Sequence, residues 1–127
     1  MKVVRIGSLS DKDLEAAKLG FKTFAHFGAD EFMGCDVSSD IPPGDVSSEG
    51  LIVKAATSRA RYAYNDCAFS VGLERRFISS EGLIKCACVV FDGFRYVTGI
   101  ASDARDEQAR ENAVQSALKK LLQVHSV

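Results

Sequence analysis

The most informative segment of this sequence is Phe69-Ser70-Val71-Gly72-Leu73-Glu74-Arg75-Arg76. It continues an apolar run from Cys67, and a run without polar alternation predicts a strand buried on both faces, over about residues 67–73. Ligands of open α/β sheets bind beyond the carboxyl ends of strands. A glycine and then an acid at such an end offer close backbone approach and a hard oxygen ligand. Glu74 is therefore a candidate metal ligand; the alternative is a β-bulge with solvated charges.

Two further strands and a helix are predicted before this segment. Residues 2–7 read as a first strand, and Ser8-Leu9-Ser10-Asp11 as a turn with helix N-cap candidates. Apolar residues then recur at helical spacing and predict a helix over about residues 11–27, with Gly28 as its stop. Residues 31–38 read as a second strand.

A second helix and the C-terminal elements surround the central segment in the same way. Residues 39–48 lack periodicity, and Ser47 or Ser48 can cap a helix whose apolar stripe ends at Ala63. After Gly82 a strand is predicted over residues 83–91, and Asp92-Gly93 predicts a hairpin to residues 94–101. Ser102 or Asp103 is then expected to cap a last helix.

The predicted element order is β-α-β-α-β-β-β-α. Two βα steps followed by a hairpin favour an α/β fold of mixed α+β type, in which three helices pack on a mixed sheet of about five strands. The 127 residues are expected to form a single domain, 1–127, because this length is typical of one domain and no linker or repeat interrupts it.

Composition limits the classes of function. Apolar residues make up 46% of the chain and charged residues 26%, which is typical of a globular protein. The net charge of −1 gives no general attraction to nucleic acid or to an anionic membrane. No apolar run approaches the roughly 18 residues that span a bilayer, and the N-terminus does not begin like a secretory signal. These features predict a cytoplasmic location.

Four cysteines lie among apolar neighbours in predicted strands: Cys35, Cys67, Cys86 and Cys88. Their spacing does not match the C-x₂₋₄-C pairs of zinc sites, and disulfides are rare in the cytoplasm. We therefore expect free thiols that act as small buried apolar side chains.

Three motifs, in order, resemble the inosine/xanthosine triphosphatase family and its ITPase-like fold. The first is Gly7-Ser8-Leu9-Ser10 with the helix start after it. The second is Val37-Ser38-Ser39-Asp40-Ile41-Pro42 followed by the helix segment Ala55–Ala60. The third is Val71-Gly72-Leu73-Glu74, followed by Cys88-Val89-Val90-Phe91-Asp92-Gly93.

The resemblance implies metal-dependent hydrolysis of inosine or xanthosine triphosphate, with Mg²⁺ or Mn²⁺ as the cofactor. It implies that Glu74 is the catalytic acid and a metal ligand, and that Glu49 is a second, weaker metal acid. By the same reading, phosphate-binding residues are Ser8, Ser10, Lys12 and Arg59. Nothing local indicates a Ser-His-Asp or Cys-His triad.

The chain also departs from the family pattern. Ser10 and Ser58 replace asparagines, Asp13 replaces a lysine, and Arg75-Arg76 replaces a glycine-rich pair. Only residues 101–105 separate the last strand from the last helix, where the family inserts a second-lobe segment. An apolar face without its cover favours a second copy of the chain, so a homodimer is expected.

Two alternatives from other classes of protein remain. One is a catalytically inactive, ITPase-like binding or assembly module, because the family's polar residues are lost at Ser10, Asp13 and Ser58. The other is a double-stranded-RNA-binding module, because two strands and a helix end that domain too. The helix of a double-stranded-RNA-binding domain begins with basic residues that hold phosphates. The last predicted helix of this chain begins with Asp106-Glu107, which has the opposite charge. Nucleic acid is therefore not an expected partner.

Overall fold

A computed structural model describes residues 2–42 and 45–126. Five strands, three α-helices and one short 3₁₀ helix follow in the order β1 Lys2–Ile6, α1 Asp11–Thr23, 3₁₀ Ala25–Phe27, β2 Ala29–Gly34, α2 Glu49–Ala63, β3 Phe69–Ile78, β4 Leu83–Phe91, β5 Tyr96–Asp103 and α3 Asp106–His125. The predicted α/β fold class and element order are confirmed.

The strands form one mixed sheet in the order β2-β1-β3-β4-β5. β1 pairs in parallel with both β2 and β3, while β3, β4 and β5 pair in antiparallel fashion. The antiparallel pairing of β4 with β5 follows from the hairpin at Asp92, whose Oδ1 accepts hydrogen bonds from the backbone N–H groups of Phe94 and Arg95 at 2.9 Å.

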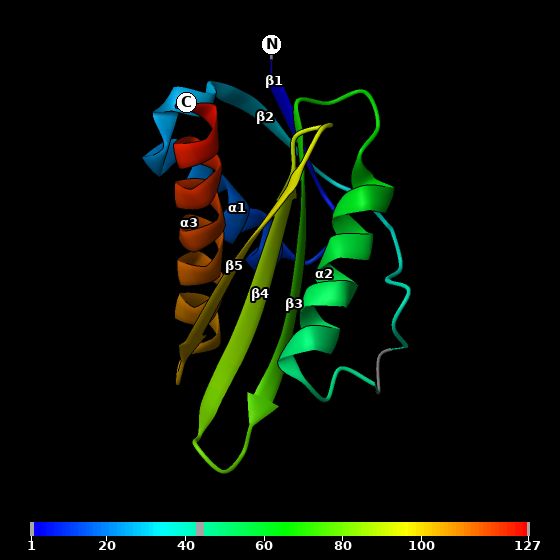
Figure 1. The fold of residues 1–127 in the computed structure, drawn as a ribbon, viewed down its shortest axis with the longest axis vertical. Helices are drawn as coiled ribbons and strands as arrows, with labels where there is room; N and C mark the ends of the chain where they lie inside the picture. The colour runs from blue at the N-terminus through cyan, green and yellow to red at the C-terminus, as the bar shows by residue number, and fades with distance from the viewer. Residues whose placement is uncertain (1, 43–44, 127) are drawn as a thin grey trace.

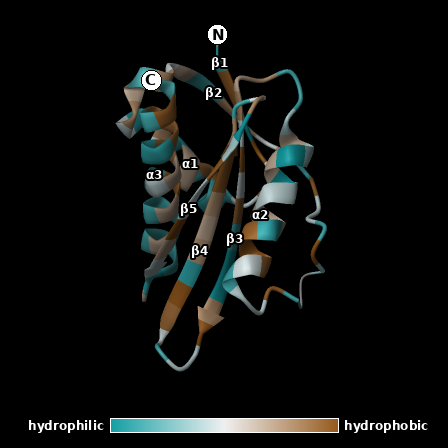
Figure 2. Cartoon of the chain, viewed as in Figure 1, coloured by the Kyte–Doolittle hydropathy of each residue, from teal (hydrophilic) through white to brown (hydrophobic). Residues whose placement is uncertain are grey.

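Helices cover both faces of this sheet. In Figure 1, α2 lies on one face and α1 and α3 lie on the other. Apolar residues of the strands are buried between the layers, and Figure 2 shows the brown, hydrophobic stretches along β4. The larger core joins α1 and α3 to the sheet through residues such as Phe21, Val71 and Leu118, and a smaller core lies under α2 around Ile52 and Val89.

Two glycines allow the helices to approach the sheet closely. A Cβ atom on Gly72 of β3 would lie 1.9 Å from the backbone oxygen of Ala56 in α2. A Cβ atom on Gly99 of β5 would lie 2.3 Å from both the oxygen of Ala113 and the nitrogen of Ala117 in α3. The sequence-based role of Gly72, backbone approach to a ligand, is therefore wrong: the glycine admits a helix.

Several predicted boundaries are also wrong. α1 ends at Thr23, and the chain tightens into the 3₁₀ turn before Gly28, which adopts a left-handed φ of 63°. β2 begins two residues before the expected start and ends at Gly34, so Cys35 is outside it, and β3 begins only at Phe69, so Cys67 is outside a strand as well. The last helix begins after Arg105, because β5 continues to Asp103.

The largest difference concerns β3, which continues through Ile78 rather than ending near Leu73. Its pairing with β4 runs from Ser70 to Ile78 without a register shift, so there is no β-bulge. Figure 1 shows the resulting β3–β4 hairpin extending beyond the helices. Charged Arg75 and Arg76 fit a strand there because neither helix layer buries this part of the sheet completely.

Candidate functional site: a polar pocket at the open edge of β3

A small polar pocket lies where β1 ends and β3 continues. β1 pairs with β3 only from Val4 to Ile6, so beyond Val71 no described strand pairs with this edge of β3. The pocket has a volume of about 120 Å³ and is lined by Ser8, Asp13, Arg59, Leu73, Glu74, Arg75 and Cys86. Successive residues of a strand face opposite sides of a sheet, so the pocket extends around the open edge.

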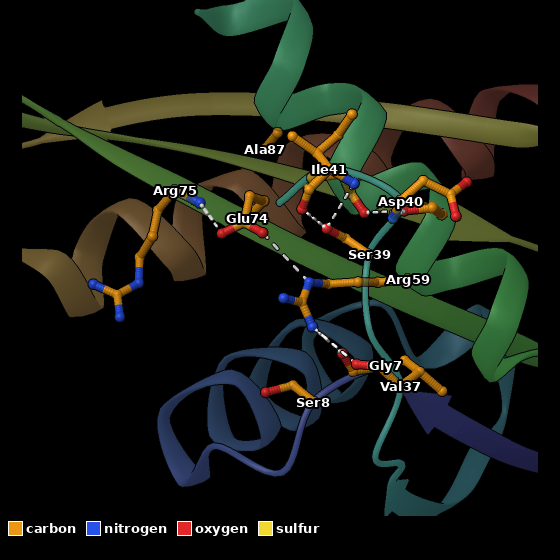
Figure 3. A network of polar contacts seen from close by, with 12 residues as sticks. Gly7, Ser8, Val37, Ser39, Asp40, Ile41, Arg59, Glu74, Arg75 and Ala87 are labelled. Carbon is orange, nitrogen blue, oxygen red and sulfur yellow. Dashed lines mark hydrogen bonds and ion pairs between the residues drawn. The ribbon is translucent and has the colours of Figure 1, made fainter. Parts of the chain in front are cut away.

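Arg59 of α2 reaches into this pocket from one side. Its Nε lies 3.4 Å from Oε2 of Glu74, and its Nη1 donates to the backbone oxygens of Val37 at 3.1 Å and Gly7 at 3.5 Å. No described residue accepts a hydrogen bond from Nη2, and the side chain is 26% exposed. Figure 3 shows the guanidinium held between Glu74 and the two carbonyls, with one nitrogen directed away from both.

Glu74 is held loosely in comparison. Besides the contact with Arg59, its Oε1 accepts a hydrogen bond from the backbone N–H of Arg75 at 3.3 Å. Both contacts are long for a charged hydrogen bond, which is usually below about 2.9 Å. The carboxylate therefore keeps lone pairs that can serve a ligand or a cation. The structure places Glu74 within β3, not after it.

Ser8 and Asp13 form the wall contributed by the start of α1. The Ser8 hydroxyl donates to Oδ2 of Asp13 at 2.7 Å and accepts from the backbone N–H of Ser10 at 3.0 Å. Oδ1 of Asp13 accepts from Nη1 of Arg110 in α3 at 2.8 Å. The single hydroxyl hydrogen of Ser8 is already used in the hydrogen bond to Asp13, so toward the pocket Ser8 can only accept a hydrogen bond.

Arg75 and Cys86 complete the lining on the α3 side. Nη1 of Arg75 pairs with Oδ1 of Asp106 at 3.1 Å, which fixes the guanidinium near α3. Burial, with a smaller contribution from Asp13, raises the pKa of the Cys86 thiol to about 12. Because the thiolate is the reactive form, Cys86 is a neutral apolar wall at physiological pH.

The other candidate residues lie outside the pocket lining. Glu49 begins α2 and pairs with Lys85 at 3.1 Å, so it is not brought to Glu74. Ser10 is the N-cap of α1 and receives a hydrogen bond from Arg110 at 3.4 Å. Lys12 lies 3.8 Å from Asp106 and is 65% exposed. Of the six candidates, Ser8, Arg59 and Glu74 therefore share the pocket.

The described residues contain no cluster of three or more His, Cys, Asp or Glu side chains suited to a metal ion. The carboxylates that line the pocket are Asp13 and Glu74. The four cysteines are free. Within residues 2–42 and 45–126, no helix combines the length and the apolar character that crossing a bilayer requires.

Comparisons with known proteins place the fold but no family. No family model matches the chain, and a search of curated proteins found no match. Among solved structures, protein VC0702 from Vibrio cholerae superposes with a TM-score of 0.81 at 14% identity, covering 99% of this chain and 98% of that protein. The competence damage-inducible protein A (ComA) from Klebsiella pneumoniae gives a TM-score of 0.53 at 11% identity, covering 98% and 86%.

A CinA superfamily (competence-damaged) protein from Enterobacter cloacae gives a TM-score of 0.51 at 15% identity, covering 98% of this chain and 82% of that protein. None of these three neighbours is named as a triphosphatase, and two carry competence-damage names. This contradicts the assignment to the inosine/xanthosine triphosphatase family. The expected hydrolysis of inosine and xanthosine triphosphates falls with that assignment, and so does the ITPase-like label of the fold. At these identities the likeness concerns the fold alone.

Three residues of the site were not predicted as such from the sequence: Arg75, which lines the pocket, and Asp106 and Arg110, which pair with lining residues. Arg75 was noted as a solvated charge and as a departure from the family pattern, Asp106 as the acidic start of a helix, and Arg110 had no predicted role. Arg110 had a signal: it lies four residues before Val114 and eight before Leu118, on the apolar stripe of α3, and all three are buried. A charged residue on such a stripe requires a buried partner.

Proposed function

We propose that this protein binds a small phosphate-bearing molecule in the pocket between Arg59 and Glu74, together with a divalent cation such as Mg²⁺ or Mn²⁺. The observation that supports this most is the fixed guanidinium of Arg59, whose Nη2 has no acceptor among the described residues. A positioned guanidinium with free N–H groups suits phosphate oxygens, to which it donates charge-assisted hydrogen bonds.

The charge of the pocket explains why a cation belongs to the proposal. The lining contains two carboxylates, Asp13 and Glu74, and two guanidinium groups, Arg59 and Arg75, so its formal charges sum to zero. A phosphate group would add negative charge to this neutral lining. Mg²⁺ commonly binds through one or two carboxylates and the phosphates of its ligand, and retains water. Glu74 would hold the cation through its weakly engaged oxygens, and Ser8 would offer an acceptor beside it.

Isothermal titration calorimetry with inorganic phosphate and pyrophosphate, each with and without Mg²⁺, tests the proposal. Wild type should bind pyrophosphate more tightly with Mg²⁺ than without it. Arg59→Ala should lower the affinity at least about tenfold, because it removes charge-assisted hydrogen bonds. Glu74→Gln should lose the Mg²⁺ enhancement but bind pyrophosphate without Mg²⁺ at least as tightly as wild type, since it removes a carboxylate while the arginines remain.

Arg61→Ala is the matched control. Arg61 lies two residues further along α2 and pairs with Asp40 away from this pocket, so its replacement should leave binding unchanged. Loss of binding in Arg61→Ala as large as that in Arg59→Ala would show that general charge, not this pocket, attracts the anion. Absence of binding by wild type to both anions, with and without Mg²⁺, would refute the proposed function.

A further inference from the structure

Arg110 is the charged residue that the described core buries most completely. It is 2% exposed and lies in α3, 97 positions after Asp13. Its Nη1 donates to Asp13 at 2.8 Å, while Nε and Nη2 contact the two carboxylate oxygens of Asp106 at 3.2 Å and 3.1 Å. A buried charge requires such partners, because moving a charged group out of water without a compensating partner costs free energy.

Asp13 depends on Arg110 for its charge balance. Of the described residues, Arg110 is the cation paired with Asp13, and the other polar partner is the neutral Ser8 hydroxyl. The Asp13 side chain is only 15% exposed, so solvent screens it weakly. Without Arg110, the pocket would therefore contain a carboxylate that no neighbouring cation compensates.

Charge is balanced across the pocket and its surroundings by four ion pairs, formed by three acids and three arginines. Glu74 pairs with Arg59, Asp106 with Arg75 and Arg110, and Asp13 with Arg110. The more distant Lys12, 65% exposed, adds a cation to Asp106 at 3.8 Å. Arg110 is shared between two acids, and one of them lines the pocket.

We propose that Arg110 sets the electrostatic potential of the pocket from outside it, by neutralising Asp13, and so allows an acid-bearing pocket to accept an anion. This inference rests on the proposed function. Arg110 is a positioning residue: it reaches the ligand only through Asp13, whose other oxygen holds the Ser8 hydroxyl. The acid at position 13, which looks unfavourable for phosphate in the sequence, is compatible with it once Arg110 is in place.

The test compares the affinity for pyrophosphate of Arg110→Gln, Asp13→Asn and the double variant, by calorimetry in the full chain. Arg110→Gln should weaken binding about tenfold, because it leaves an uncompensated charge a few ångströms from the anion. Asp13→Asn should tighten binding several-fold, because Arg110 then keeps an excess positive charge. The double variant should recover most of the wild-type affinity, and higher salt should shrink all differences.

An exposed pair provides the matched control. Arg61 and Asp40 approach to 2.8 Å, as Arg110 and Asp13 do, but their side chains are 50% and 46% exposed and lie away from the pocket. Arg61→Gln and Asp40→Asn change the net charge by the same amounts and should leave the affinity unchanged.

The opposite signs distinguish the proposal from a merely structural role. If Arg110 only anchored α3, Arg110→Gln and Asp13→Asn would both weaken binding, and that result would overturn the inference while leaving the proposed function intact. If Arg110→Gln does not fold, Asp13→Asn alone decides, since tighter binding supports the inference and weaker or equal binding refutes it. Absence of pyrophosphate binding by both wild type and Asp13→Asn overturns the inference and the proposed function together.

Discussion

The helices α2 and α3 meet the sheet through the same device but serve the pocket differently. Each places a pair of alanines, four residues apart, over a strand glycine: Ala56 and Ala60 over Gly72, and Ala113 and Ala117 over Gly99. Each also sends one arginine toward the pocket. Arg59 of α2 is partly exposed and is held mainly by backbone carbonyls, whereas Arg110 of α3 is buried and is held by carboxylates.

This difference indicates how an arginine can be fixed and still remain available. Carbonyl oxygens orient a guanidinium without cancelling its charge, and Glu74, the one carboxylate paired with Arg59 among the described residues, contacts it at a long 3.4 Å. Arg59 therefore keeps more of its positive potential for a ligand than Arg110 does. The charge of Arg110, in contrast, is neutralised by the two carboxylates with which it pairs. The same residue type on two similarly packed helices is therefore expected to bind in one place and to balance charge in the other.

The largest expected effect comes from disrupting the α2 contact with Gly72→Ala. The added Cβ would lie 1.9 Å from a backbone oxygen, so the helix itself must move rather than a side chain. We expect the free energy of unfolding to fall by about 3 kcal/mol, the upper part of the usual range for overpacking. Urea denaturation measures it. Gly82→Ala, with a φ of 64° and no atom within 4 Å, controls for backbone strain alone and should cost about 1 kcal/mol.

Gly99→Ala tests the equivalent contact of α3 and should cost less, about 2 kcal/mol. The added Cβ meets backbone atoms at 2.3 Å, but β5 is an edge strand and can shift outward, whereas β3 lies between β1 and β4. Urea denaturation of the two variants side by side decides the point. Equal losses of stability would show that strand position does not distinguish the two contacts.

The smallest expected effect concerns a tie that joins the end of α3 to the β4–β5 turn. His125 contacts Oδ2 of Asp92 at 2.9 Å. Burial tends to raise the pKa of Asp92, but hydrogen bonds from His125 and from the backbone N–H groups of Arg95 and Phe94 outweigh it and lower the pKa below the ordinary 3.8. The charged carboxylate therefore stabilises the fold above that ordinary value, and its contribution is lost as the pH falls through the lowered pKa.

Asp92→Asn removes this charge while its Oδ1 can still accept the turn hydrogen bonds. We expect the variant to be less stable than wild type by about 1 kcal/mol at pH 6, and the difference to shrink as the pH falls below about 4. Urea denaturation at a series of pH values from 6 to 3 measures it. A difference that stays constant over this range would contradict the assignment of the stabilisation to the ionised carboxylate.

The sequence predicted the parts of this fold that local chemistry determines. Apolar periodicity placed the helices and strands in the correct order, Asp92-Gly93 identified the hairpin, and Ser48 does cap α2, because its Oγ accepts from the backbone N–H of Leu51. Ends of elements were predicted less well. The strand β3 continues past the end of its apolar run, because its second half pairs with β4 beyond the helix layers. Arg75 and Arg76 can reach solvent there.

The candidate site is formed by residues that are far apart in the sequence, and local sequence patterns do not predict which of them meet. Arg59 and Glu74 were predicted as single residues, and their contact at 3.4 Å confirms only that they are neighbours. The family resemblance implied Glu49 as a second, weaker metal acid beside Glu74, but in the structure Glu49 pairs with Lys85. The homodimer and the cytoplasmic location stay predictions.

The position of Arg110 after all the residues that line the pocket has a consequence for synthesis on the ribosome. Chains emerge from their N-terminus at roughly 5–20 residues per second and fold in units as they do so. Every residue that lines the pocket has emerged once β5 is complete, yet Arg110 follows only with α3. A nascent chain would thus carry the acidic Asp13 uncompensated until α3 docks, and would gain its affinity for anions only at that step.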